Sequence, residues 1–217
     1  MLDFNNEAEQ KAGSGPVPAG SKVMVTIKVK TPKYAIPDNP LVSRAKSGLR
    51  GLWCEFAVTG GMYDGVVWYD NLWLPAGYQT IRLSEGQTKT CNRGGAQIRA
   101  IIEAHRGISP KNTDSRSVQG RRLNDWSDLD GMEFPAKLGI SSEPYIGKDG
   151  NQYWSNYITS IITPDKKDYS DLKAGGEFIT DGPVTGDGKA KASAPVADGN
   201  ISGWDDPPVD AYNDMPF

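Results

Sequence analysis

The alternating stretch from Lys22 to Lys30, in which only Met24 departs from the apolar–polar pattern, places the strongest constraint on the fold. The aliphatic residues fall on one side of an extended chain: Val23, Val25, Ile27 and Val29. Three lysines fall on the other side: Lys22, Lys28 and Lys30. This two-residue period is typical of a strand with one face on a core and the other in water. We therefore expect a β-sheet domain whose first strand presents cations outward.

Four more strands and a single helix follow this strand in the sequence. Only the segment 96–106 shows helical spacing, and Gly107 and Pro110 follow it. The other expected strands lie at about 49–59, 66–74, 134–140 and 153–162. The resulting order, β-β-β-α-β-β, is that of the OB fold, a five-stranded barrel with a helix between strands three and four. The predicted fold class is thus all-β with one helix, and another small barrel or sandwich is the alternative.

Composition and charge change near residue 174. Residues 1–173 carry 22 Lys and Arg against 19 Asp and Glu, a net charge of +3. Residues 174–217 carry two lysines against eight acids, a net charge of −6, and 12 Gly or Pro. Such a segment buries too little apolar surface to offset the loss of chain entropy on folding. We predict a flexible N-terminal arm at 1–21, an OB-fold domain at 22–173 and a disordered acidic tail at 174–217.

The residue types that carry enzyme chemistry are sparse. Cys54, Cys91 and His105 are too few for a zinc site of ordinary ligands. His105 falls at the end of the predicted helix, where it complements the helix dipole. The densest carboxylate cluster could serve a metal nuclease, but such residues commonly close turns: Asp125, Asp128 and Asp130. We predict no enzyme activity, no catalytic residues, no metal and no cofactor.

The last residues of the sequence resemble the C-terminal tip of bacterial single-stranded-DNA-binding proteins, which ends in acids followed by Ile-Pro-Phe. Asp214, Pro216 and Phe217 match this pattern, and Met215 replaces the aliphatic residue. Further acids precede the tip: Asp205, Asp206 and Asp210. The resemblance implies that these residues recruit replication or recombination proteins, such as a polymerase, a helicase or primase, or an exonuclease. An aromatic ring beside a carboxylate suits a hydrophobic hole rimmed by Arg or Lys.

The body resembles phage-encoded OB-fold single-stranded-DNA-binding proteins. The resemblance rests on Pro18-Ala19-Gly20 before strand one, on the strand order, and on the segment 150–162. It implies a protein that coats and protects single-stranded DNA during phage replication, recombination or repair, with RNA as an alternative ligand. The expected location is the cytoplasm of the infected bacterial host cell. No apolar run is long enough to span a membrane, and residues 1–10 do not form a signal peptide.

Single-strand binding without sequence preference uses cations along the phosphates and aromatic rings that stack on bases. In an OB fold these groups lie on strands two and three and in the loops that join strands 1–2 and 4–5. The candidates are Lys22, Lys28 and Lys30 in strand one, Lys33, Tyr34, Arg44, Lys46 and Arg50 in loop 1–2, Trp53, Tyr69 and Trp73 in strands two and three, and Tyr145, Lys148 and Tyr153 around loop 4–5. On strand three the alternation leaves open whether Trp68 or Tyr69 faces outward.

A different class of function also fits the tip. An interaction protein could mimic the tail of the host single-stranded-DNA-binding protein and divert replication or repair enzymes. Such a protein shares residues 205–217 but needs no basic groove. The two hypotheses differ in whether the body binds single strands at all.

Overall fold

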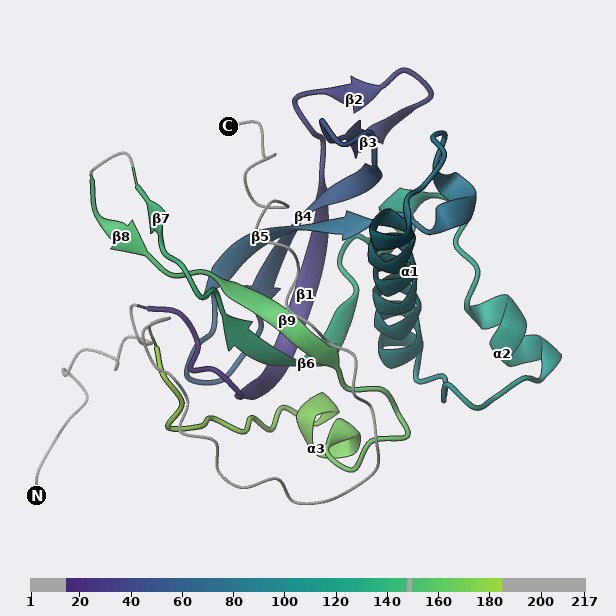
Figure 1. Cartoon of the computed structure of the whole chain (residues 1–217). Coiled ribbons are helices and arrows are strands. Elements are labelled where there is room, and N and C mark those ends of the chain that lie inside the picture. The colour runs from purple at the N-terminus through teal and green to yellow at the C-terminus, as the bar shows by residue number, and fades with distance from the viewer. Residues whose placement is uncertain (1–14, 148–149, 185–217) are drawn as a thin grey trace, which may run out of the picture.

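A computed structural model describes residues 15–147 and 150–184. It is mostly β, with a curled half-barrel sheet and few helices (Figure 1). The sheet is built around β1 (Lys22–Lys30), which pairs antiparallel with β4 (Arg50–Val58) on one side and β6 (Glu133–Ile140) on the other. β5 (Val67–Trp73) adds outside β4, and β9 (Asn156–Ile161) adds outside β6. The five principal strands therefore lie in the order β5-β4-β1-β6-β9.

The predicted closed barrel is present only as this curved sheet. In the described residues no hydrogen-bonded pairing joins β5 to β9, although the two strands contact one another. The helix α1 (Glu85–Arg106) packs against both edge strands, β5 and β9, and against β6. Along the chain, α1 follows the third principal strand (β5) and precedes the fourth (β6), as the sequence pattern predicted.

Two short hairpins occupy segments that the sequence analysis left as loops, except for Tyr153, which was expected to begin the strand 153–162. β2 (Ala35–Ile36) pairs with β3 (Asn39–Arg44), and β3 also pairs antiparallel with the start of β4. β7 (Tyr145–Ile146) pairs with β8 (Gln152–Tyr153) as a separate two-stranded sheet. Both hairpins project from the body of the domain (Figure 1). β2, β7 and β8 are too short for alternation to reveal them, because two residues define no period, and β3 begins with Asn39-Pro40 in a proline-rich segment.

The prediction of one helix is wrong, since the described residues contain three α-helices and two 3₁₀ turns. The additional elements are α2 (Ser115–Gly120), α3 (Tyr169–Lys173), η1 (Ala76–Tyr78) and η2 (Trp126–Leu129). α1 also starts at Glu85 rather than near residue 96, because a capping box begins it there. The Gln87 backbone N–H donates to the Ser84 hydroxyl, and the Ser84 backbone N–H donates to the Gln87 side-chain oxygen. At Gly94 an added Cβ would lie 2.0 Å from the Trp73 carbonyl oxygen, so the first half of α1 packs through glycine and not through large apolar side chains.

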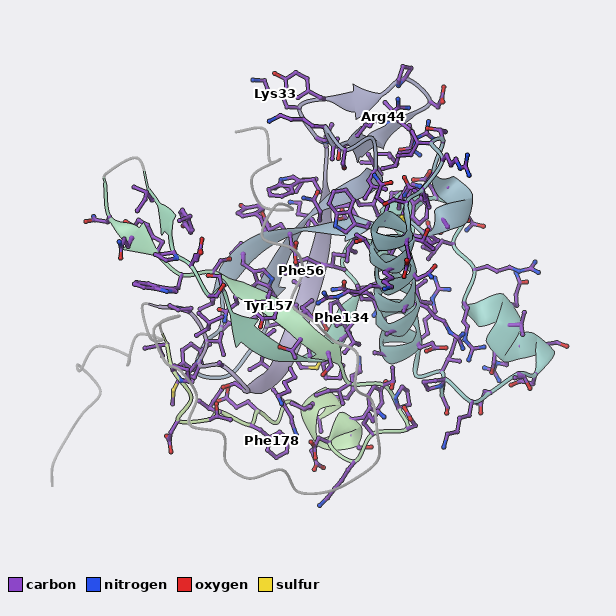
Figure 2. All side chains as sticks on the ribbon, viewed as in Figure 1. Lys33, Arg44, Phe56, Phe134, Tyr157 and Phe178 are labelled. Atoms are coloured by element: carbon purple, nitrogen blue, oxygen red, sulfur yellow. The ribbon has the colours of Figure 1, made fainter. Side chains whose placement is uncertain are left out.

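The core follows the predicted alternation. Val23, Val25 and Ile27 are all at most 1% exposed, and they pack in one cluster with Phe56 and Phe134. Figure 2 shows these two phenylalanines on the strands beside α1. The structure decides which aromatic residue of strand three (β5) faces the core. Trp68 is 3% exposed and stacks on Phe56 with ring centroids 5.6 Å apart. Tyr69 on the same strand consequently faces outward.

Packed contacts extend beyond both predicted domain boundaries, at 21 and at 173. Val17 is fully buried, and its backbone exchanges hydrogen bonds of 2.9 and 2.8 Å with the Asn156 side chain. On the other side, Phe178 pairs through its backbone with Lys22 at 2.8 and 2.9 Å. Neither residue lies in a long periodic stretch, so the sequence gave no sign of these contacts. The predicted tail tip, 205–217, lies outside the described residues.

Candidate nucleic-acid interface

The side of β1, β4 and β5 opposite the core is called here the outer sheet face. Its central residues come from three adjacent strands: Lys28, Lys30, Trp53, Glu55 and Tyr69. Strand alternation places them together, since the residues between them fill the core. The sequence analysis predicted four of these five residues as ligands of nucleic acid, and Glu55 is the addition.

Trp53 and Tyr69 form an aromatic pair on this face. Their rings are nearly parallel, with an interplanar angle of 10° and centroids 5.7 Å apart. They are diagonal neighbours, because Glu55 lies opposite Tyr69 in the strand register. Tyr69 is 46% exposed. The pair therefore offers aromatic surface to a planar ligand.

A carboxylate links this aromatic pair to a lysine. Glu55 Oε2 lies 3.1 Å from Lys30 Nζ and accepts a hydrogen bond of 2.9 Å from the Tyr69 hydroxyl. The bond from Lys30 is the main cause that holds the pKa of Glu55 below its ordinary value. The same bonds raise the pKa of Lys30 and of Tyr69. Glu55 thus fixes the Tyr69 ring and offsets one of the two central cations, whereas Lys28 is exposed.

The face continues toward the β2–β3 hairpin. Trp73 is half-buried over Gly51, where an added Cβ would lie 3.1 Å from its Cε3 atom. Tyr34 is 59% exposed, and Lys33 Nζ lies 5.3 Å from its ring centroid. The Arg44 guanidinium lies 3.4 Å from the Thr80 hydroxyl. Figure 2 shows Lys33 and Arg44 at this end of the molecule. Lys46, just beyond β3, is also exposed.

The β7–β8 hairpin presents a second aromatic pair. Tyr145 and Tyr153 stack with centroids 5.4 Å apart and an interplanar angle of 24°, and both are exposed. Ile146 beside them is 62% exposed, a feature that the sequence analysis missed because a two-residue strand carries no pattern. Lys148, predicted at the tip of this hairpin, lies outside the described residues.

Two predicted cations are not brought together with the others. Lys22 lies at the far end of β1, where its ammonium forms an ion pair with Asp168 and sits 5.7 Å from the Phe178 ring centroid. Arg50 is half-buried on the core side of β4, and its Nε is buried with no hydrogen-bond partner in the described part of the chain. Both side chains are positioned by packing, which the loop and strand patterns did not reveal.

The carboxylate cluster that could have served a metal forms turns and caps. Asp125 accepts from the Ser127 amide at 2.9 Å, Asp128 from the Asn124 amide at 2.6 Å, and Asp130 from the Val29 amide at 2.6 Å. In residues 15–147 and 150–184 no group of His, Cys, Asp and Glu has the arrangement of a metal site. His105 Nδ1 accepts from the Glu133 amide at 3.1 Å and so ties the end of α1 to β6.

Comparisons with known proteins give no assignment for this surface. No family model matches the sequence, and a search of curated proteins finds no match. None of the helices described is long and apolar enough to cross a membrane. The outer sheet face carries a half-buried tryptophan stacked on an exposed tyrosine, one exposed lysine and one lysine held by a carboxylate. Two hairpins with exposed tyrosines flank it.

Proposed function

We propose that the chain is an OB-fold single-stranded-DNA-binding protein that holds the strand on the outer sheet face and between its two hairpins. The observation that carries this proposal is the Trp53–Tyr69 pair, with Tyr69 exposed and Trp53 half-buried, beside Lys28 and Lys30 on a curved sheet. Every base has a flat aromatic face, so stacking on such a pair requires no particular sequence, and contributes about 1–3 kcal/mol per base. Lysines and arginines along the path neutralise the phosphates.

The topology supports the OB assignment. Three antiparallel strands in sequence (β1, β4, β5), then a helix, then β6 and β9 reproduce the expected order. In that fold, ligands cross strands two and three and are flanked by the loops between strands 1–2 and 4–5. Those loops correspond to the β2–β3 and β7–β8 hairpins, which carry Tyr34, Tyr145 and Tyr153. The aromatic groups thus occur on all three parts of such a path.

The acidic segment 205–217 is proposed to recruit replication or recombination proteins. Four acids attract a basic partner, and Met215, Pro216 and Phe217 supply an apolar anchor with little rotational freedom at the proline. In this proposal the protein coats single strands during phage replication, recombination or repair, in the cytoplasm of the bacterial host. It performs no catalysis and needs no cofactor.

The proposal is tested by titrating the full chain with oligo(dT) and with a duplex of equal length while following tryptophan fluorescence. We expect quenching by the single strand, with an affinity that falls as salt rises. Tyr69→Ala should weaken binding, whereas Tyr69→Phe keeps the ring and serves as the matched control. Equal or tighter binding to duplex DNA would reject single-strand specificity.

A second candidate is the interaction protein that mimics a host tail. It is favoured by one observation, that two of the three strand-one lysines already pair with carboxylates, Lys22 with Asp168 and Lys30 with Glu55. This candidate predicts retention of a partner protein through residues 205–217 but no binding of oligo(dT) even at low salt. The same titration therefore decides between the two.

A further inference from the structure

A groove on the far side of α1 is separate from the outer sheet face. It has a volume of about 880 Å³ and lies between α1, η1 and the segment that carries α2 and η2. Figure 1 shows α1 between the sheet and α2. Its apolar lining includes Tyr78, Ile98, Ile102, Val118, Leu123 and Trp126. Ile98 and Ile102 are buried and form its floor, whereas Tyr78 and Val118 are exposed.

The aromatic rings of the groove meet edge to face. Tyr78 and Trp126 have centroids 5.1 Å apart and an interplanar angle of 72°. Two rings in this orientation do not form a continuous flat platform for successive bases, in contrast to the nearly parallel pair on the sheet. The groove is better suited to an apolar or aromatic side chain that inserts between them.

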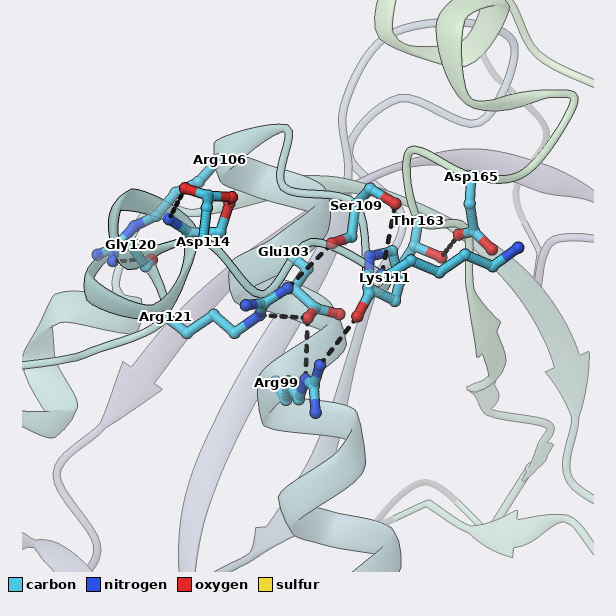
Figure 3. Close-up of polar contacts among 12 residues, drawn as sticks. Arg99, Glu103, Arg106, Ser109, Lys111, Asp114, Gly120, Arg121, Thr163 and Asp165 are labelled. Carbon is cyan, nitrogen blue, oxygen red and sulfur yellow. Dashed lines mark hydrogen bonds and ion pairs between the residues drawn. The ribbon is translucent and has the colours of Figure 1, made fainter.

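Three arginines line the groove: Arg99, Arg121 and Arg122. Two of them are already engaged, since Arg99 and Arg121 meet at Glu103 (Figure 3). Glu103, whose side chain is 3% exposed, lies 2.8 Å from Arg99 Nε and 2.5 Å from Arg121 Nε. Arg99 also donates to the Pro110 carbonyl at 3.2 Å, and Arg121 to the Ser109 carbonyl at 2.9 Å. Two guanidinium groups therefore share one buried carboxylate and leave the site positively charged.

The third arginine is available to a ligand. Arg122 is exposed, and its side chain makes no hydrogen bond or ion pair with any other residue that the structure describes. Arg106 holds the backbone beneath it, because its Nη1 donates to the Gly120 and Arg122 carbonyls at 2.7 and 3.0 Å. Asp125 also lines the groove. Glu103 and Asp125 offset two of the three arginine charges, which disfavours a continuous polyanion and favours a ligand with separate carboxylates between apolar groups.

The chain itself contains a segment of this chemistry. Residues 204–217 carry four acids, Asp205, Asp206, Asp210 and Asp214, interspersed with the apolar and aromatic residues Trp204, Val209, Tyr212, Met215 and Phe217. Nineteen residues lie between Val184 and Trp204, and the twenty peptide links that join the two can span up to roughly 70 Å. A domain of this size has a radius of gyration of about 15 Å. The segment can therefore reach the groove of its own body.

We infer that the groove beside α1 binds residues 204–217 of the same chain, and so holds the partner-recruiting segment on the body at a distance from the outer sheet face. An aromatic residue of the segment inserts beside Tyr78 and Trp126, and its carboxylates pair with Arg122 and the outer edge of Arg99. Because the groove and the sheet face are separate, the docked segment does not compete with a bound strand. This inference does not depend on whether the body binds DNA.

The test uses the full chain with a spin label at Ser202→Cys. Cys54 and Cys91 are buried, so the label attaches to the new thiol. We expect the amide NMR signals of 98–102 and 118–126 to lose most of their intensity, while those of β4 and β5 keep theirs. Arg122→Glu should restore the lost intensity without changing the thermal unfolding midpoint, because Arg122 is exposed. Replacing the four acids of the segment by asparagine should restore it independently.

Four results would overturn the inference. Broadening on β4 and β5 would place the segment on the sheet face instead, and no broadening anywhere on the body would show that it does not dock. Broadening of isotope-labelled chains by separate spin-labelled chains would show docking between two copies. Finally, if oligo(dT) shifts the groove amides and abolishes the broadening, the groove belongs to the path of the nucleic acid.

Discussion

The outer sheet face and the groove beside α1 contain the same kinds of residue, aromatic rings, cations and a glutamate, in opposite arrangements. On the sheet, Trp53 and Tyr69 are nearly parallel and Lys30 is held by a carboxylate at the surface. In the groove, the rings meet at 72° and the arginines surround the buried Glu103. Residue type alone therefore does not define either surface.

The difference in ring orientation and in prior pairing is the basis on which we propose different ligands for the two surfaces. Parallel exposed rings accept a flat base, whereas an edge-to-face pair over an aliphatic floor accepts a single inserted side chain. A surface ion pair is readily exchanged for a phosphate contact, because it is solvated. A buried carboxylate that holds two arginines is not exchanged, so its role is to fix the groove.

The largest expected effect comes from Glu103→Ala, which leaves the mostly buried Arg121 side chain without its carboxylate partner. Removal of one partner of a buried ion pair costs about 3–5 kcal/mol. We expect a loss of this size in the free energy of unfolding by urea. Arg99→Ala is the matched control, because Arg99 is 55% exposed in its side chain and its loss should cost about 1 kcal/mol or less. Equal effects of the two variants would show that Glu103 does not organise the groove.

A second prediction concerns Asp70, which lies on the core side of β5, next to the outward-facing Tyr69. Burial raises the pKa of Asp70 to about 6 from an ordinary 3.8. The folded protein therefore binds more protons than the unfolded chain between these values, and stability falls as pH rises through this window. Asp70→Asn removes this dependence and should be more stable than wild type above pH 6, by about 2–3 kcal/mol. Urea unfolding at pH 4 and pH 7 measures the pH dependence of stability and the gain in the variant. If the free energy of unfolding changes with pH equally in wild type and variant, the Asp70 carboxyl is not buried as described.

Trp53→Ala and Trp126→Ala compare the two aromatic pairs directly. Loss of one stacked base contact corresponds to about 1–3 kcal/mol, a 5- to 150-fold weaker affinity for oligo(dT). We expect this loss for Trp53→Ala only, measured by anisotropy of a labelled oligonucleotide. Trp126→Ala should leave the affinity unchanged. A similar loss in both variants would remove the distinction between the two surfaces.

Glu55→Gln should give the smallest effect. It removes the carboxylate that offsets Lys30 and leaves a neutral acceptor for Tyr69, so one more cation can meet a phosphate. We expect a few-fold tighter binding to oligo(dT), with the slope of log affinity against log salt steeper by up to about 0.7. The salt series is the measurement. Weaker binding would mean that Glu55 chiefly holds the Tyr69 ring in its binding orientation.

The fold was predictable where the pattern is local and long. β1 spans the predicted Lys22–Lys30, because nine alternating residues leave one possible face for the core. The first half of α1 was not predictable from apolar spacing, since it packs through Gly94 and is started by the Ser84 cap. On strand three both alternate positions carry aromatic residues, so only the stacking of Trp68 on Phe56 assigns Tyr69 to the outside.

The sequence by itself determined the strand order, the outward placement of Trp53, and the separation of a basic body from an acidic segment, since periodicity and composition depend on neighbouring residues. The tertiary structure alone decided which charges are already paired. Lys22 with Asp168, Lys30 with Glu55, and Arg121 with Glu103 join residues from different elements. No local pattern encodes such contacts, because they depend on how the strands and helices pack.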